Sequence, residues 1–139
     1  MEKERRRQPS DRRRPVLIVS ANPDTVELYV LSLRNERNAV TSVESADEAL
    51  PLVRDRRVSA VVVDVANPKF DWNACRQLVE AGEPDLPLIV LTGWIDQEAR
   101  GQAFDLGCAA FVAKPASPDR LRDVLQRTRA GERGIVSVE

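Results

Sequence analysis

The chain has 139 residues, of which 42% are hydrophobic and 31% are charged, and its net charge is −1. This length and composition are typical of one ordinary globular domain and exclude a disordered or membrane protein. The sequence has no histidine and only two cysteines, which excludes histidine-based catalysis, histidine–metal sites and a disulfide framework. No apolar run approaches the ~20 residues that a membrane helix needs, so we expect a cytoplasmic protein without a membrane partner.

The first 14 residues differ from the rest in charge. They contain seven basic and three acidic residues, a net charge of +4, which leaves −5 for the remainder of the chain. Because Met1 is the only apolar residue among them, we predict a disordered basic arm. We interpret this arm as a solvated tail and not as a nucleic-acid-binding element, since it has no aromatic residue to stack on bases and no helix-turn-helix follows.

From Pro15 onward, short apolar segments predict the strands of a sheet. These segments are continuous and rich in β-branched residues, which is typical of parallel strands that helices cover on both faces. The strands are expected at residues 16–19, 39–43, 58–63, 88–91 and 109–112. The last residues, 135–138, fit either a short extra strand or a tail.

Helices are expected between these strands, and several have clear start signals. Asn22 is a good N-cap before Pro23, and Ser45 and Glu48 have the spacing of a capping box. Pro51 should kink or shorten the helix that follows Ser45. Further helices are expected at about residues 71–81 and 96–106 and from Ser117-Pro118 onward. The residues expected to face the core are Val26, Val30, Leu33, Ala99, Ala103, Leu106, Leu121, Val124, Leu125 and Thr128.

Five successive strand–helix units predict an α/β domain over residues 15–130, with a doubly wound five-stranded parallel sheet, (βα)5, and a tail or strand at 131–139. In such sheets the functional crevice lies beyond the carboxyl ends of the strands. The residues at these ends are therefore the candidates for function. They are Ser20-Ala21-Asn22, Asp64, Thr92-Gly93 and Lys114-Pro115.

These residue types indicate phosphoryl chemistry. An aspartate at a strand end, here Asp64, can attack a phosphoryl group and form an acyl phosphate. Lys114 can balance the negative charge of the phosphoryl oxygens. The Thr92 hydroxyl can donate a hydrogen bond to one of these oxygens, and Gly93 leaves its backbone N–H open to a bulky anion.

The chain resembles the response-regulator receiver domain over roughly residues 15–130. The segments that carry the resemblance are VVVDVANPKFDW around Asp64, PLIVLTG ending in Thr92-Gly93, and LGCAAFVAKP ending in Lys114-Pro115. The resemblance implies a flavodoxin-like fold in which Asp64 accepts a phosphoryl group from a histidine kinase or a phosphotransfer protein. It also implies that Thr92 and Phe111 are switch residues, with Phe111 moving inward on activation.

One departure from the family concerns the metal. The family usually places two acidic residues after its first strand, where they hold Mg²⁺ together with the phosphoacceptor. Ser20 and Ala21 stand there in this chain, so Asp64 is the only expected metal ligand. Since Mg²⁺ prefers several carboxylate ligands, we predict a weak or absent Mg²⁺ site. Phosphorylation should then be slow, metal-independent or absent. Ala66 and Trp94 are also unusual and lie where the family tunes its reaction rate.

Several candidates have a plain structural alternative. Asp24 as a substitute metal ligand competes with a carboxylate that favours the first turn of a helix, and Asn22 is better explained as a cap. Phe111 as a switch competes with Phe111 as core, and Lys114 competes with a solvated surface lysine. Cys75 and Cys108 are expected to be inert packing residues.

We therefore predict a non-enzymatic, stand-alone receiver that signals through a downstream protein partner or as a homodimer. The alternative is a degenerate receiver that acts as a protein-interaction module without phosphorylation. An enzyme on a similar sheet is disfavoured, since the sequence has no glycine-rich phosphate loop.

Overall fold

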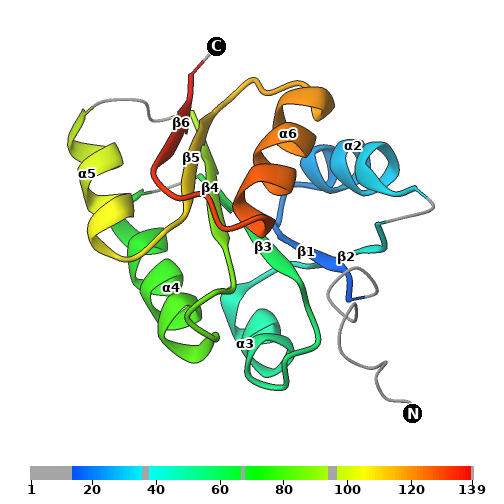
Figure 1. The fold of residues 1–139 in the computed structure, drawn as a ribbon, viewed down its shortest axis with the longest axis horizontal. Coiled ribbons are helices and arrows are strands. Elements are labelled where there is room, and N and C mark those ends of the chain that lie inside the picture. The colour runs from blue at the N-terminus through cyan, green and yellow to red at the C-terminus, as the bar shows by residue number, and fades with distance from the viewer. Residues whose placement is uncertain (1–13, 36–37, 67, 94–96, 139) are drawn as a thin grey trace.

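The computed structural model describes residues 14–35, 38–66, 68–93 and 97–138. Strands and helices alternate along this part of the chain (Figure 1). Their bounds are β1 (Val16–Val19), α2 (Pro23–Leu33), β2 (Val40–Val43), α3 (Ala46–Arg54), β3 (Ala60–Val65), α4 (Pro68–Ala81), β4 (Leu88–Thr92), α5 (Gln97–Asp105), β5 (Ala110–Ala113), α6 (Pro118–Arg129) and β6 (Ile135–Ser137).

The sheet has six strands in the order β2-β1-β3-β4-β5-β6, and every pair is parallel. The α/β class and the doubly wound order are confirmed, but the prediction of five strands is wrong by one. Residues 135–137 form the sixth strand, in which Val136 is the partner of Phe111 on β5. A strand of three residues is too short for hydrophobic periodicity to distinguish it from a tail.

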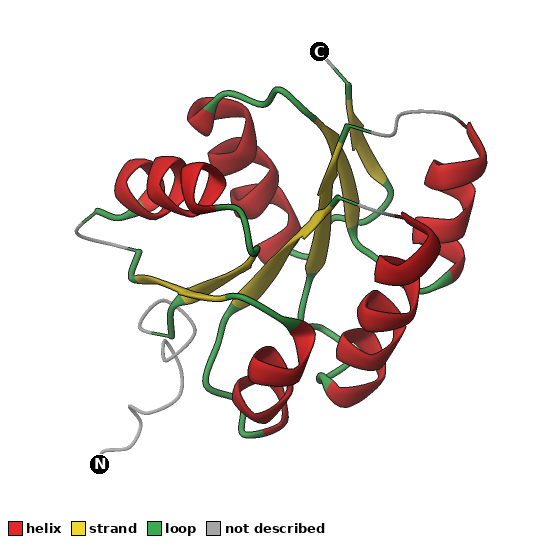
Figure 2. Ribbon diagram, turned by 180° about the vertical axis from the view of Figure 1, so that it is seen from behind, coloured by secondary structure: helices red, strands yellow, loops and turns green. Residues whose placement is uncertain are grey.

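The pleat of the sheet divides the core into two layers. Successive side chains of a strand point to opposite faces, and the two buried clusters follow this alternation. Helices α3, α4 and α5 cover one face, and α2 and α6 cover the other, an arrangement that Figures 1 and 2 show from opposite sides. The central strands are therefore buried on both faces, as their continuous apolar sequences predict.

The helix start signals are confirmed. The Asn22 side chain accepts hydrogen bonds from the backbone N–H groups of Asp24 and Thr25, and Ser45 accepts one from Glu48. Ser117 caps α6 in the same way. Pro51 lies inside α3, which continues to Arg54, and α4 begins at Pro68, three residues before the predicted start.

The inward face of α2 differs from the prediction. Leu33 is buried as expected, but the second buried residue is Tyr29, whereas Val26 and Val30 stay partly exposed. Tyr29 was missed because a hydroxyl group must find a partner when it is buried, and no sequence pattern shows that partner. The structure provides it, since the Tyr29 hydroxyl donates to the carbonyl of Ala116 at 2.6 Å. The four residues predicted to face inward from α6 are all buried.

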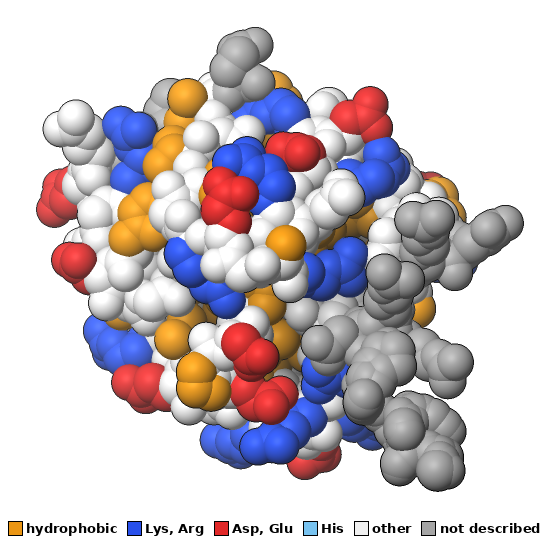
Figure 3. Space-filling view, viewed as in Figure 1, with side chains coloured by type: hydrophobic (Ala, Val, Ile, Leu, Met, Phe, Trp, Pro, Cys, Tyr) orange, Lys and Arg blue, Asp and Glu red, His pale blue; other side chains and the backbone are white. Residues whose placement is uncertain are grey.

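The predicted arm lies outside the described residues except for Arg14. This residue donates a hydrogen bond to the Arg56 carbonyl at 3.0 Å and lies 3.7 Å from a carboxylate oxygen of Glu83. Over the described residues visible in Figure 3, side chains of both charge signs are interspersed. None of the described helices combines the length and apolarity required for a membrane span.

The layered packing gives a first testable prediction. Phe111 is fully buried among the side chains of the α3, α4 and α5 face. Replacing it by alanine removes a large apolar side chain and leaves a cavity, so we expect Phe111→Ala to lower the free energy of unfolding by about 3–5 kcal/mol. Urea denaturation followed by circular dichroism measures this change.

The matched control is Leu31→Ala, because the Leu31 side chain is 63% exposed and its loss should change stability by no more than about 0.5 kcal/mol. A Phe111→Ala variant as stable as this control would contradict the core position of Phe111.

Candidate functional site

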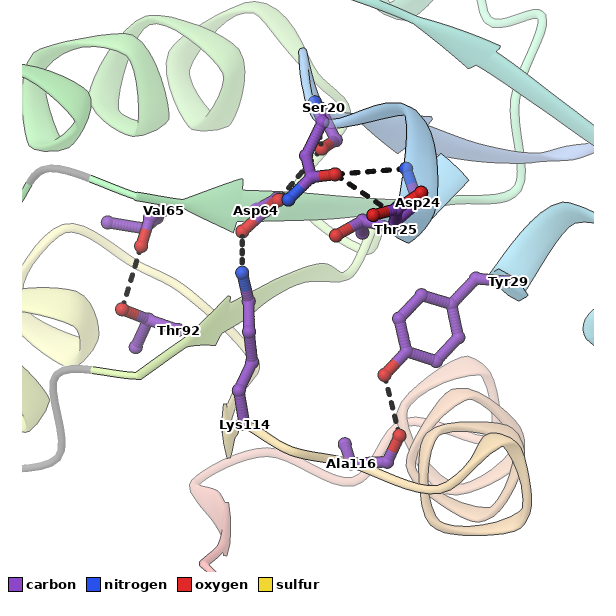
Figure 4. Close-up of polar contacts among 10 residues, drawn as sticks. Ser20, Asp24, Thr25, Tyr29, Asp64, Val65, Thr92, Lys114 and Ala116 are labelled. Carbon is purple, nitrogen blue, oxygen red and sulfur yellow. Dashed lines mark hydrogen bonds and ion pairs between the residues drawn. The ribbon is translucent and has the colours of Figure 1, made fainter. Parts of the chain in front are cut away.

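The sheet brings three of the predicted site residues together at its carboxyl edge. Ser20 follows β1, Asp64 is the penultimate residue of β3, and Lys114 follows β5. By the alternation of the pleat, each continues the row of its strand that packs under α2 and α6. Asp64 is the register partner of Leu91, which belongs to that same layer of the core. The three side chains therefore converge above a single face of the sheet (Figure 4).

Both oxygens of the Asp64 carboxylate are in contact with these neighbours. The Ser20 hydroxyl donates a hydrogen bond to Oδ2 at 2.7 Å. The Lys114 ammonium lies 2.5 Å from Oδ1, in a close ion pair that lacks the alignment of a hydrogen bond. The Asp64 side chain is only 4% exposed, whereas that of Lys114 is 30% exposed. A nearly buried carboxylate is thus balanced by one cation and one neutral donor.

Thr92 lies on the opposite face of the sheet. It is the register partner of Val65, and both pack toward the α3, α4 and α5 layer. Its fully buried hydroxyl donates to the Val65 carbonyl at 2.8 Å. The Thr92 carbonyl accepts a hydrogen bond from the Lys114 backbone N–H, also at 2.8 Å. In this structure Thr92 therefore supports the Lys114 backbone, and its hydroxyl points away from Asp64.

A cavity of about 480 Å³ opens beside Asp64. Ser20, Lys114 and the predicted candidate Ala66 line it, together with Glu44, which follows β2. Glu44 was missed because the sequence does not show that β2 neighbours β1. Gly93 is exposed, and a Cβ atom at this position would meet no other atom within 4 Å. Trp94 lies outside the described residues.

The turn that carries Lys114 is held by side chains from two helices. Its peptide bond to Pro115 is cis. The Arg120 guanidinium donates to the carbonyls of Pro115 and Ala113, at 3.1 and 3.4 Å. It also donates to the carbonyl of Ser137 on β6, at 2.8 Å. From the other side, Tyr29 of α2 donates to the carbonyl of Ala116.

The residues do not fit a family-type Mg²⁺ site. Ser20 and Ala21 supply no carboxylate, and both Asp64 oxygens already contact other groups. Within the described ranges, no group of three Asp, Glu, Cys or His side chains could hold a metal ion. Asp24 is exposed in the first turn of α2, where Asn22 caps its backbone N–H. The site thus offers a lysine and a serine where a metal would otherwise balance charge.

The remaining candidates are placed in the core. Phe111 is fully buried, and Cys75 and Cys108 are buried on the same side of the sheet. These positions fit packing residues. The Phe111 side chain is already buried in the core in this structure, so the inward position expected of a switch residue is occupied at the outset.

Comparisons with known proteins agree on the family. The profile of the response regulator receiver domain matches residues 16–126. The response regulator MprA of Mycobacterium sp. (strain KMS) is 33% identical over 122 residues, which cover 84% of this chain and 53% of MprA. The chain thus spans about half the length of this relative. An uncharacterized 14.6 kDa protein of Leptolyngbya boryana is 34% identical over 81% of this chain and 87% of its own length.

Solved structures show the same fold. A LuxR-family two-component response regulator from Aurantimonas sp. SI85-9A1 superimposes with a TM-score of 0.77 at 24% identity, covering 88% of this chain and 89% of the other. The chemotaxis protein CheY4 of Vibrio cholerae gives 0.73 at 21% identity, over 82% and 97% of the two chains. With the profile and the MprA match, these similarities lead to one conclusion: the chain belongs to the response regulator receiver domain family of two-component signalling.

Proposed function

We propose that this domain is a receiver in which Asp64 accepts a phosphoryl group and in which Lys114 and Ser20, instead of a bound metal, balance the charge. The ion pair between Lys114 and Asp64 is the observation that carries the proposal. In the transfer, an Asp64 oxygen forms a bond to phosphorus while the bond from phosphorus to the donor breaks. The donor leaves with the electron pair, and Asp64 becomes an acyl phosphate.

The geometry explains why this reaction should be slow. Each Asp64 oxygen already contacts Ser20 or Lys114. These contacts leave each oxygen a lone pair for the attack but lower its nucleophilicity. The carboxylate is also nearly buried, which restricts the approach of a donor. Thr92 can help only after its hydroxyl leaves the Val65 carbonyl, at a net cost of about 1 kcal/mol for the lost hydrogen bond.

The phosphodonor would be a histidine kinase or a phosphotransfer protein in the cytoplasm. The phosphorylated domain would signal through contacts with a downstream protein or through a homodimer. The proposed switch residues are Thr92 and the fully buried Phe111. The Thr92 carbonyl accepts a hydrogen bond from the Lys114 backbone N–H, so a movement of Thr92 would reach Lys114 directly. Phe111 lies on β5, the strand that ends just before Lys114.

A second candidate function has an observation in its favour. With both oxygens of Asp64 in contact with Ser20 and Lys114, the site is complete without phosphate. The domain would then be an interaction module that is not phosphorylated. Asp64 would stabilise the carboxyl edge of the sheet through its contacts with Ser20 and Lys114.

Phosphoryl uptake separates the two functions. Incubation with acetyl phosphate, in magnesium or in EDTA, should add one phosphoryl group to the intact mass at the same rate in both buffers. Asp64→Asn should show no addition, because it lacks the nucleophile. No uptake in either buffer would favour the interaction module, and uptake that requires magnesium would disprove the metal-independent charge balance.

A second prediction concerns the lost metal site. In the double variant Ser20→Asp/Ala21→Asp, three carboxylates stand together, so we expect magnesium to stabilise it by about 1.4 kcal/mol at a tenfold excess over the dissociation constant. Urea denaturation with and without magnesium measures this difference within each protein. The unmodified chain should show no such stabilisation.

The matched control is Gln77→Glu/Gln126→Glu, which adds the same charge at two exposed positions far from the site in sequence. Equal stabilisation of this control by magnesium would mean that the ion only screens surface charge.

A further inference from the structure

The Tyr29 hydroxyl makes a contact that the apolar face of α2 does not require. Tyr29 is 4% exposed and packs with Leu33 in the α2 and α6 layer. A phenylalanine would fill the same space without having to bury a polar group. The Tyr29 hydroxyl instead reaches the Ala116 carbonyl, 87 residues away in sequence and two residues beyond Lys114.

This contact closes a loop of interactions around Asp64. Helix α2 begins three residues after Ser20, whose hydroxyl also accepts a hydrogen bond from the backbone N–H of the N-cap residue Asn22 at 3.1 Å. The same helix carries Tyr29, which fixes the turn after Lys114. Ser20 and Lys114, the two partners of Asp64, are thus joined through α2 as well as through the sheet, and Figure 4 shows Tyr29 and Ala116 on the Lys114 side of the site.

Electrostatics agree with this placement. Burial raises the pKa of Tyr29 above its ordinary value, the positive charge of Arg120 lowers it, and the negative charge of Asp64 raises it. Tyr29 therefore stays protonated at neutral pH and can act only as a donor to the carbonyl.

We propose that Tyr29 is a positioning residue for Lys114: its hydroxyl holds the turn at Ala116 so that the Lys114 ammonium meets the Asp64 carboxylate. Arg120 holds the preceding carbonyls of the same turn, but it also binds Ser137 on β6. Tyr29 is therefore the cleaner residue to test. The consequence for phosphoryl uptake rests on the proposed function, whereas the consequence for the ion pair does not.

The experiment compares Tyr29→Phe with Thr128→Val in the full chain. Thr128 is the matched control, because its buried hydroxyl also donates to backbone carbonyls, those of Val124 and Leu125, but within α6. Both substitutions remove one buried hydroxyl and keep the apolar volume. A residue that only adds stability would therefore give the same result at both positions.

The first readout is NMR of lysine side chains labelled with ¹³C at Cε, which is simple because the chain has only three lysines, Lys3, Lys69 and Lys114. Asp64→Asn provides the reference signal of a Lys114 without its carboxylate. We expect Tyr29→Phe to move the Lys114 signal toward that reference and Thr128→Val to leave it unchanged. A Lys114 signal that is unchanged in Tyr29→Phe, or that moves equally in both variants, would overturn the proposal.

The second readout is the rate of uptake from acetyl phosphate. A misplaced lysine should slow uptake in Tyr29→Phe by about 10- to 100-fold, with no change in Thr128→Val. If the unmodified chain takes up no phosphate, the proposed function fails, but the NMR signal still decides the role of Tyr29. A normal rate in Tyr29→Phe together with a displaced Lys114 signal would overturn the catalytic consequence.

Discussion

A carboxylate that is almost wholly removed from water needs compensating charge or hydrogen bonds, since an isolated buried anion is very costly. In this domain Asp64 is such a group, and its pairing with Lys114 and Ser20 meets the requirement. Much of the carboxyl edge of the sheet is arranged around this pairing. The Lys114 backbone is bound to Thr92, the turn after it to Tyr29 and Arg120, and Ser20 to the start of α2.

The arrangement also explains how a family member can keep the family's fold with Ser20 and Ala21 at the positions of the usual acids. A divalent cation would compete with Lys114 for the same carboxylate, and it would find Ser20 and Ala21 where it needs acids. Because Ser20 stands where the family has an acid, its interaction with Asp64 is attractive and not repulsive. An acidic neighbour would repel Asp64 unless a metal lay between them, whereas the Ser20 hydroxyl attracts it directly. In the proposed function, the contacts of Asp64 with Lys114 and Ser20 take the place of an ion in balancing its charge.

Much of the fold could be predicted from the sequence, because buried parallel strands and capped helices leave local patterns. Asn22, Ser45 and Ser117 mark helix starts, and the continuous apolar segments mark the inner strands. The convergence of Asp64 and Lys114 follows from the rule that strand ends meet at one edge. The missed features depend on contacts between distant residues. Nothing near Tyr29 indicates a bond to Ala116, and nothing near Glu44 shows that it borders the Asp64 cavity. The orientation of the Thr92 hydroxyl depends on the face of the sheet to which the side chain points, and the end of a short apolar strand does not show that face.

Strand β6 has a consequence for the outer boundary of the domain. It pairs with β5 along residues 110–112, and Arg120 fastens its end through the side chain and the carbonyl of Ser137. A truncation at residue 130, after the last helix, would uncover the apolar strand β5, whose open backbone groups could pair with other chains. With β6 present, the edge of the sheet next to β5 is instead a strand of only three residues, and such a short edge offers little template for aggregation. Strand β6 thus covers the backbone edge of β5.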